Sequence, residues 1–240
     1  MSSNLIELPT RMFGLALVSI LTLTMAGCEK TDNRGEGHTY TYKYKITVTI
    51  RDQGHLLQAS DVVRVREQSY NGIALVPKLC GEATALKLIN GRYLFALLNG
   101  PTLDLQPGRQ QWRGAPTGVL LQRLGLQTEW SWKDDSGLRQ LLNVKTPVQF
   151  DPDEMPEFVS FRDMNDPTTV ERIEPTQIPE WLGDDIKVEG VTVQITNEQA
   201  TRGHLAHILP WLIPSQDFLD GSRWGKPVHG IQSRQFARCQ

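Results

Sequence analysis

Alternating side chains give the clearest structural signal in this chain. From residue 40 to residue 51, aromatic or β-branched residues occupy every second position, with polar residues between them. This period of two predicts a long β-strand with one buried face. A turn is expected at residues 52–54, and a second strand near residues 60–68, where Val63 and Val65 alternate with arginines. The inward residues of the first strand would be Tyr40, Tyr42, Tyr44, Ile46, Val48 and Ile50.

The segment from residue 82 to residue 98 predicts a β-hairpin. Two strand-like runs, Glu82–Ile89 and Arg92–Leu98, flank Asn90-Gly91. This pair suits a two-residue type I′ turn because both turn positions need a positive φ. Alternation along the two arms predicts the following inward side chains: Leu86, Leu88, Tyr93, Phe95 and Leu97.

Strands dominate the remaining pattern. They are expected at Glu157–Arg162 and Ile186–Thr196, a short helix is expected at Thr201–Leu209, and Val119–Leu126 suits either element. The strands do not alternate with helices as they do in a doubly wound fold. The chain is therefore predicted to be mainly β, an antiparallel β-sandwich or partly open barrel with a few short helices.

An apolar segment before the first strand predicts export. Residues 12–27 carry no charge and follow Arg11, which is the arrangement of a signal peptide. The segment is short for a membrane-spanning helix, which needs about 20 apolar residues. Met25-Ala26-Gly27-Cys28 resembles a lipobox, which implies cleavage before Cys28 and acylation of that residue with chains such as palmitate. The alternative, a buried apolar helix, would need a domain wrapped around it.

These signals divide the chain into four parts. We expect a lipoprotein signal peptide at residues 1–27, a polar tether at 28–37, a single β-rich domain at 38–220 and an irregular C-terminal tail at 221–240. The protein would then be lipid-anchored in the bacterial cell envelope and face the periplasm. The protein could be anchored in the inner or the outer membrane. An aspartate directly after the cysteine would resemble an inner-membrane retention signal, but this position is Glu29. Either Met1 or Met12 fits as the first translated residue.

Composition narrows the choice of partners. The 240 residues are 39% hydrophobic and 22% charged, with a formal net charge of −2, as in ordinary globular proteins. Duplex nucleic acid is bound through many lysine and arginine contacts, so we expect no nucleic-acid partner. The near-neutral, mixed charge also argues against a polybasic membrane-surface patch.

Two cysteines remain once Cys28 is acylated. Cys80 and Cys239 would then be the only thiols in an oxidising compartment, and they have one possible pairing. A disulfide between them would join the C-terminal tail to the β-rich domain. The alternative is a small buried Cys80 and a Cys239 on a frayed terminus.

Two stretches resemble uncharacterised proteobacterial envelope lipoproteins of unknown function. The first is Gly81–Leu88 with Gly91–Leu98, and the second is Ile195–Glu198 with Thr201–Gly203 and Leu209–Leu212. Together with the first strand, the resemblance covers most of the mature chain. It implies a single domain and assigns no catalytic residue.

Candidate chemistry is limited to a few clusters. His204 and His207 have the i, i+3 spacing that places two imidazoles on one helix face, but a zinc site needs three or four ligands. Carboxylates are frequent between Asp151 and Asp166, and those of the segment from Asp151 to Pro156 are expected on a solvated loop, because no glycine supplies a calcium-loop turn. The tryptophans are expected mainly in the core, although they could also form the floor of a carbohydrate- or peptide-binding groove. They are Trp112, Trp130, Trp132, Trp181, Trp211 and Trp224.

The favoured hypothesis is a non-catalytic envelope lipoprotein without a cofactor. The lipid anchor would attach the protein to a membrane, and the domain would bind a protein or cell-wall partner or play a structural role. Catalytic motifs such as a nucleophile elbow or a P-loop do not occur in the sequence. The alternative is a metal-dependent hydrolase using His204 and His207. A third hypothesis, a peptide chaperone working by strand addition, needs an exposed sheet edge.

Acylation at Cys28 is the first testable prediction. Mass spectrometry of protein extracted from membranes should find an acylated N-terminal cysteine, because the apolar segment ends in Met25-Ala26-Gly27-Cys28. Cys28→Ser should release the protein from membranes or leave it unprocessed. A native N-terminus at Met1 or Met12 with an unmodified Cys28 would contradict the prediction.

Overall fold

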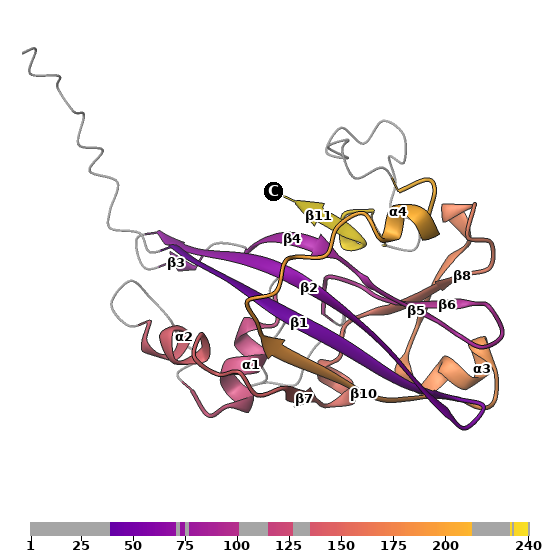
Figure 1. Ribbon diagram of the computed structural model, residues 1–240, viewed down its shortest axis with the longest axis horizontal. Helices are drawn as coiled ribbons and strands as arrows, with labels where there is room; N and C mark the ends of the chain where they lie inside the picture. Colours follow the sequence, from indigo (N-terminus) through magenta and orange to yellow (C-terminus); the bar gives the residue numbers. More distant parts are fainter. Residues whose placement is uncertain are drawn as a thin grey trace, which may run out of the picture. The chain divides into compact units, whose positions relative to one another are not determined.

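The computed structural model describes residues 39–70, 73–74, 77–100, 115–126, 135–212, 231 and 233–239. In this part of the chain, two antiparallel sheets pack face to face, and a few short helices accompany them (Figure 1). Neither sheet closes into a barrel within the described residues. The predicted mainly β sandwich is therefore confirmed.

The larger sheet is built around β1 (Thr39–Asp52), which pairs with β2 (His55–Tyr70) along its whole length and with β10 (Ile186–Ile195) on its other side. The strand order is β11-β4-β2-β1-β10-β7, and a short β3 pairs with the end of β2. The remaining bounds are β3 Ile73–Ala74, β4 Lys78–Glu82, β7 Val148–Phe150 and β11 Ala237–Cys239.

The alternation predicted for β1 is present. Tyr42, Tyr44, Ile46, Val48 and Ile50 are buried, and they define the inner face of the larger sheet. The intervening polar residues lie on the opposite side, the outer face. Positive φ values at Gln53 (49°) and Gly54 (81°) make the β1–β2 connection a two-residue turn of type I′.

The smaller sheet contains the predicted hairpin, with a different turn from the one expected. Thr84 pairs with Ala96 and Lys87 with Tyr93, but Gly91 (φ 84°) is the one loop residue with positive φ. The Leu88 nitrogen donates to the Arg92 carbonyl, so three residues form the loop. This is a type I turn followed by a left-handed glycine, and the predicted two-residue type I′ turn is wrong. The strands are β5 Thr84–Lys87, β6 Tyr93–Ala96, β8 Phe158–Phe161 and β9 Val170–Ile173, in the order β5-β6-β8-β9.

Both faces of the smaller sheet are buried. Leu86 and Leu94 pair with each other and join the core under the inner face of the larger sheet. Phe95 and Leu97 point to a second core on the other side. The expectation of a single inward face shared by Leu86 and Phe95 was therefore wrong. A strand buried on both faces is apolar at successive positions, so alternation cannot assign its sides.

Short helices complete both cores. Leu120 and Leu138, from α1 (Thr117–Arg123) and α2 (Ser136–Leu141), join the core under the inner face of the larger sheet. No helix in the described residues is long and apolar enough to cross a membrane. The other helical segments of the described residues are α3 Ile178–Leu182, α4 Leu205–Ile208 and the 3-10 turns at Pro152–Glu154, Pro167–Thr169, Pro175–Gln177 and Ser233–Gln235.

The end of the chain is more ordered than the predicted irregular tail. β11 pairs with β4, which makes it an edge strand of the larger sheet. Ile231 and Phe236 are buried in the second core with Leu205 and Leu209 of the α4 region. The C-terminal segment therefore covers the outer side of the smaller sheet. Its short length and mixed composition concealed this role in the sequence.

Substitution of Gly91 tests the hairpin turn. Nothing lies within 4 Å of a Cβ placed at Gly91, so the penalty for Gly91→Val would come from the backbone alone. A left-handed conformation costs an L-residue about 1–2 kcal/mol, and the free energy of unfolding in urea should fall by that amount. Gly91→Asn should lose less, because asparagine tolerates this region. Equal stability of wild type and Gly91→Val would show that the turn lies elsewhere.

Candidate functional site

A groove of about 680 Å³ lies where the hairpin tip meets α3 and the end of β8. Three separate segments of the chain contribute to it, so no single motif reveals it in the sequence. Its residues are two arginines, three aromatic residues and three others: Arg92, Arg162, Tyr93, Phe161, Trp181, Asn90, Gly91 and Met164.

Hydrogen bonds from the hairpin tip hold one wall of the groove. The Asn90 side chain donates to the Leu182 carbonyl at 2.9 Å, and the Arg92 guanidinium donates to the Trp181 carbonyl. Carbonyls in the last turn of a helix lack partners within the helix, so these two donors fix the end of α3. The short helix thereby keeps Trp181 at the groove.

A cation and an aromatic ring meet in the groove. The Arg162 guanidinium carbon lies 5.8 Å from the centroid of the Trp181 ring, within the range of a cation–π contact. Arg162 also pairs with Glu171 at 2.5 Å, while its side chain remains 69% exposed. Beyond the end of β8, Met164 is held by Trp211, whose indole nitrogen donates to the Met164 carbonyl at 2.9 Å.

The lining suits an anionic ligand with flat or ring-shaped parts. No carboxylate lines the groove, and no described acidic side chain pairs with Arg92. Guanidinium groups bind carboxylates and phosphates through paired donors, and aromatic faces supply apolar contact area. Trp181 is only partly buried, unlike the fully buried tryptophan expected for a core position.

Comparisons with protein-family models, with curated proteins and with solved structures found no match for this chain. The resemblance to envelope lipoproteins stays a prediction.

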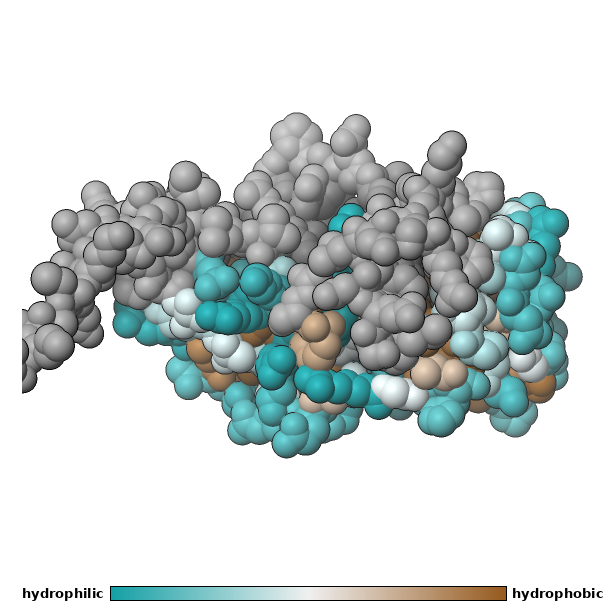
Figure 2. Space-filling model, turned by 90° about the horizontal axis from the view of Figure 1, so that it is seen from above, coloured by the Kyte–Doolittle hydropathy of each residue, from teal (hydrophilic) through white to brown (hydrophobic). Residues whose placement is uncertain are grey.

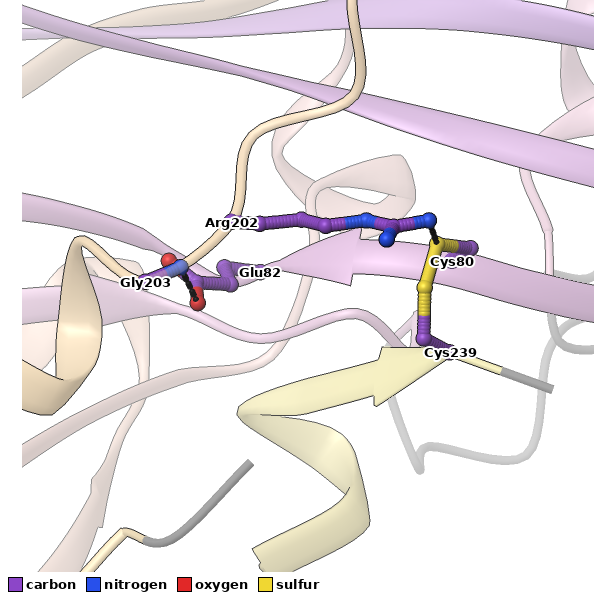
Figure 3. Close-up of a disulfide and its surroundings, with 5 residues drawn as sticks. All are labelled: Cys80, Glu82, Arg202, Gly203 and Cys239. Atoms are coloured by element: carbon purple, nitrogen blue, oxygen red, sulfur yellow. Dashed lines mark hydrogen bonds between the residues drawn. A yellow bond between two sulfur atoms is a disulfide. The ribbon is translucent and has the colours of Figure 1, made fainter. Parts of the chain in front are cut away.

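The structure places Cys80 and Cys239 in a disulfide bond (Figure 3). They lie directly opposite each other on β4 and β11, with Cα atoms 3.9 Å apart and a sequence separation of 159. Arg202 crosses over β4 and donates to the Cys80 sulfur at 2.8 Å. Cys28 lies outside the described residues, as do the whole predicted signal peptide and tether.

His204 immediately precedes the single turn of α4 and His207 lies within it, and both are exposed. In the described part of the chain, no three side chains of His, Cys, Asp or Glu gather where they could hold a metal ion. The local partner of this turn is instead Glu82, whose buried carboxylate accepts from the backbone nitrogens of Gly203, His204 and Leu205 at 2.5–3.0 Å (Figure 3 shows the first contact).

Two carboxylates of the segment 151–166 are buried: Glu154, which was expected on a solvated loop, and Glu157, at the start of an expected strand. Glu154 is 5% exposed and pairs with Arg123. Glu157 is equally buried and pairs with Arg172. Prolines and charges made this segment look exposed, whereas arginines from distant elements neutralise these two side chains.

A buried aspartate lies close to the Glu82 contact. Asp61, on β2, is 4% exposed. Burial raises its pKa from 3.8 to about 6, opposed by a hydrogen bond with Thr201 and by the charge of His204, while Glu82 adds to the rise. The folded protein therefore holds this proton more tightly than the unfolded chain does.

The raised pKa of Asp61 predicts a dependence of stability on pH. The stability that Asp61 contributes is fully present below pH 4 and is lost as pH rises towards 6, because the unfolded chain releases the proton first. The loss amounts to roughly 3 kcal/mol. Urea unfolding at a series of pH values should show it in wild type and not in Asp61→Asn.

A second aspartate provides the control for this measurement. Hydrogen bonds from Thr168 lower the pKa of the exposed Asp166, so Asp166→Asn should affect stability in the opposite direction, as pH falls. If wild type and Asp61→Asn differ by the same free energy at every pH, the assignment to Asp61 fails.

Proposed function

We propose that this chain is a lipid-anchored, non-catalytic protein of the bacterial cell envelope whose β-rich domain binds cell-wall peptidoglycan through the groove. The observation that carries the proposal is the lining of the groove. Two arginines, Arg92 and Arg162, line it together with the aromatic residues Tyr93, Phe161 and Trp181, and no carboxylate does.

Peptidoglycan has the chemistry that this lining recognises. Its stem peptides end in carboxylates, which suit guanidinium donors, and its sugar rings offer apolar faces to aromatic side chains. A lipid anchor facing the periplasm would place the domain beside this polymer. The Arg162–Trp181 contact holds a cation and a ring face together, as a ligand carrying both kinds of group requires.

The groove lies at the far end of β1 from the proposed tether. Asp52, the last residue of β1, accepts from the Ile89 nitrogen in the hairpin tip at 2.7 Å, whereas Thr39 begins the strand. Cys28 and Thr39 are separated by a segment that spans at most about 40 Å when extended. The anchor and the proposed binding site would therefore use opposite ends of one strand.

Sedimentation with purified peptidoglycan sacculi tests this function. Wild type should sediment with the sacculi, and Arg162→Gln should weaken binding about tenfold, since a hydrogen bond to a charged group contributes about 1.5–3 kcal/mol. Added salt should weaken wild-type binding. Arg162 is exposed, so the substitution should leave the melting temperature nearly unchanged.

The matched control is Arg51→Gln. Arg51 also pairs with a glutamate on a neighbouring strand, Glu189 at 2.7 Å, but it does not line the groove. This variant should bind sacculi as wild type does. Failure of wild type to sediment, or equal loss in both variants, would overturn the proposal.

A further inference from the structure

Basic side chains gather on the outer face of the larger sheet near the start of β1. Lys43 lies directly opposite Arg64 in the β1–β2 ladder. Arg66, two residues further along β2, lies opposite Lys78 of β4. Alternation puts all four on the same side of the sheet. The sequence contains no run of basic residues here, because cross-strand pairing brings together side chains from three segments.

These charges are poorly compensated by the described residues. Arg64, Arg66 and Lys78 are exposed, and no described carboxylate forms an ion pair with them. Lys43 donates to the Asn197 carbonyl at 2.6 Å, which leaves its charge in place. Only Lys45, next on this face, has an acidic partner among the described residues, Glu198 at 3.1 Å.

The arrangement is unfavourable for the isolated domain. Directly opposed side chains on antiparallel strands lie close together, and like charges there destabilise the sheet. Arg202 adds a further cation, because it extends over β4 to Cys80 (Figure 3). The chain as a whole is slightly acidic, and its mixed charge argues against a basic patch of this kind. Strand pairing nevertheless concentrates positive charge locally on this face, which is made of Lys43, Arg64, Arg66, Lys78 and Arg202.

The surroundings of this face are polar. The described surface in view in Figure 2 is largely hydrophilic, with hydrophobic patches between. The large exposed hydrophobic residues of the described chain are Leu56 and Ile89, in the β1–β2 hairpin and the β5–β6 tip, at the other end of β1 from the basic face. Attraction at this face is therefore electrostatic, because the described residues place no large exposed hydrophobic side chain on it.

We propose that this basic face docks on an anionic lipid surface. The inference rests on the proposed lipid anchor, because Thr39, where β1 begins, pairs with Gln68 two residues beyond the Thr41–Arg66 pair. A tether entering at this point holds the basic face close to the bilayer, which raises its effective concentration there. Lysine and arginine near a membrane surface attract anionic headgroups over a Debye length.

Lysine acetylation on vesicles tests the docking. The full-length lipoprotein is reconstituted into vesicles of phosphatidylcholine alone or of phosphatidylcholine mixed with an equal amount of phosphatidylglycerol, and modification of Lys78 is compared with that of the exposed Lys87 on β5. Lys78 should be protected about threefold or more on the anionic vesicles only, and high salt should remove this protection.

Paired variants make the result specific. Arg64→Gln with Arg66→Gln should abolish the protection of Lys78. The control is Arg51→Gln with Lys187→Gln, because these two cations face each other at the other end of the same sheet, and it should keep the protection. Both variants should keep the disulfide and the wild-type melting temperature within a few degrees.

The two proposals fail in different ways. Failure to float with phosphatidylcholine vesicles would contradict the lipid anchor. Flotation with both kinds of vesicle and equal acetylation of Lys78 on each would overturn the docking of the basic face and leave the anchor standing. Flotation with anionic vesicles alone would support the basic face without the anchor.

Discussion

Burial of the smaller sheet on both faces is the constraint on which the rest of the described fold depends. Leu86 and Leu94 need a cover on one side, and Phe95 and Phe161 need one on the other. The inner face of the larger sheet provides the first cover. The second must come from the end of the chain, since α4 and Phe236 supply much of the second core. Removing the C-terminal segment would expose the aromatic residues that support the groove.

Strand β4 connects the two cores and holds the second cover in place. Its last residue, Glu82, accepts three backbone hydrogen bonds at the start of α4, so a buried carboxylate serves the amides that a short helix leaves unpaired. Its central residue, Cys80, is bonded to Cys239. A cross-link over so long a loop limits the unfolded chain and stabilises the fold by roughly 4–5 kcal/mol in chain-entropy estimates. The two contacts together fix a segment too short to fold by itself.

The sequence predicts features that depend on neighbouring residues better than those that depend on register. Alternation in β1 identified its buried face, because the other face of that strand is polar and not buried. Asn90-Gly91 marked the hairpin but not its turn type, because one left-handed glycine suffices for a three-residue loop. The groove and the basic face join segments far apart in sequence, as Arg66 and Lys78 do. Their positions follow from strand pairing, which local patterns do not specify.

One continuous ladder links the two surfaces. The β1–β2 pairing runs without a register shift from Thr39–Gln68 to Asp52–His55, and the hairpin tip beside the groove is hydrogen-bonded to Asp52. The connection from β10 to α4 crosses over both strands (Figure 1), with Thr201 bonded to Val62. Bending between the two ends would break this ladder. A polar tether alone leaves a domain free to turn, whereas a docked basic face would hold the groove in one direction relative to the bilayer. Electrostatic docking would thus orient a site that it does not touch.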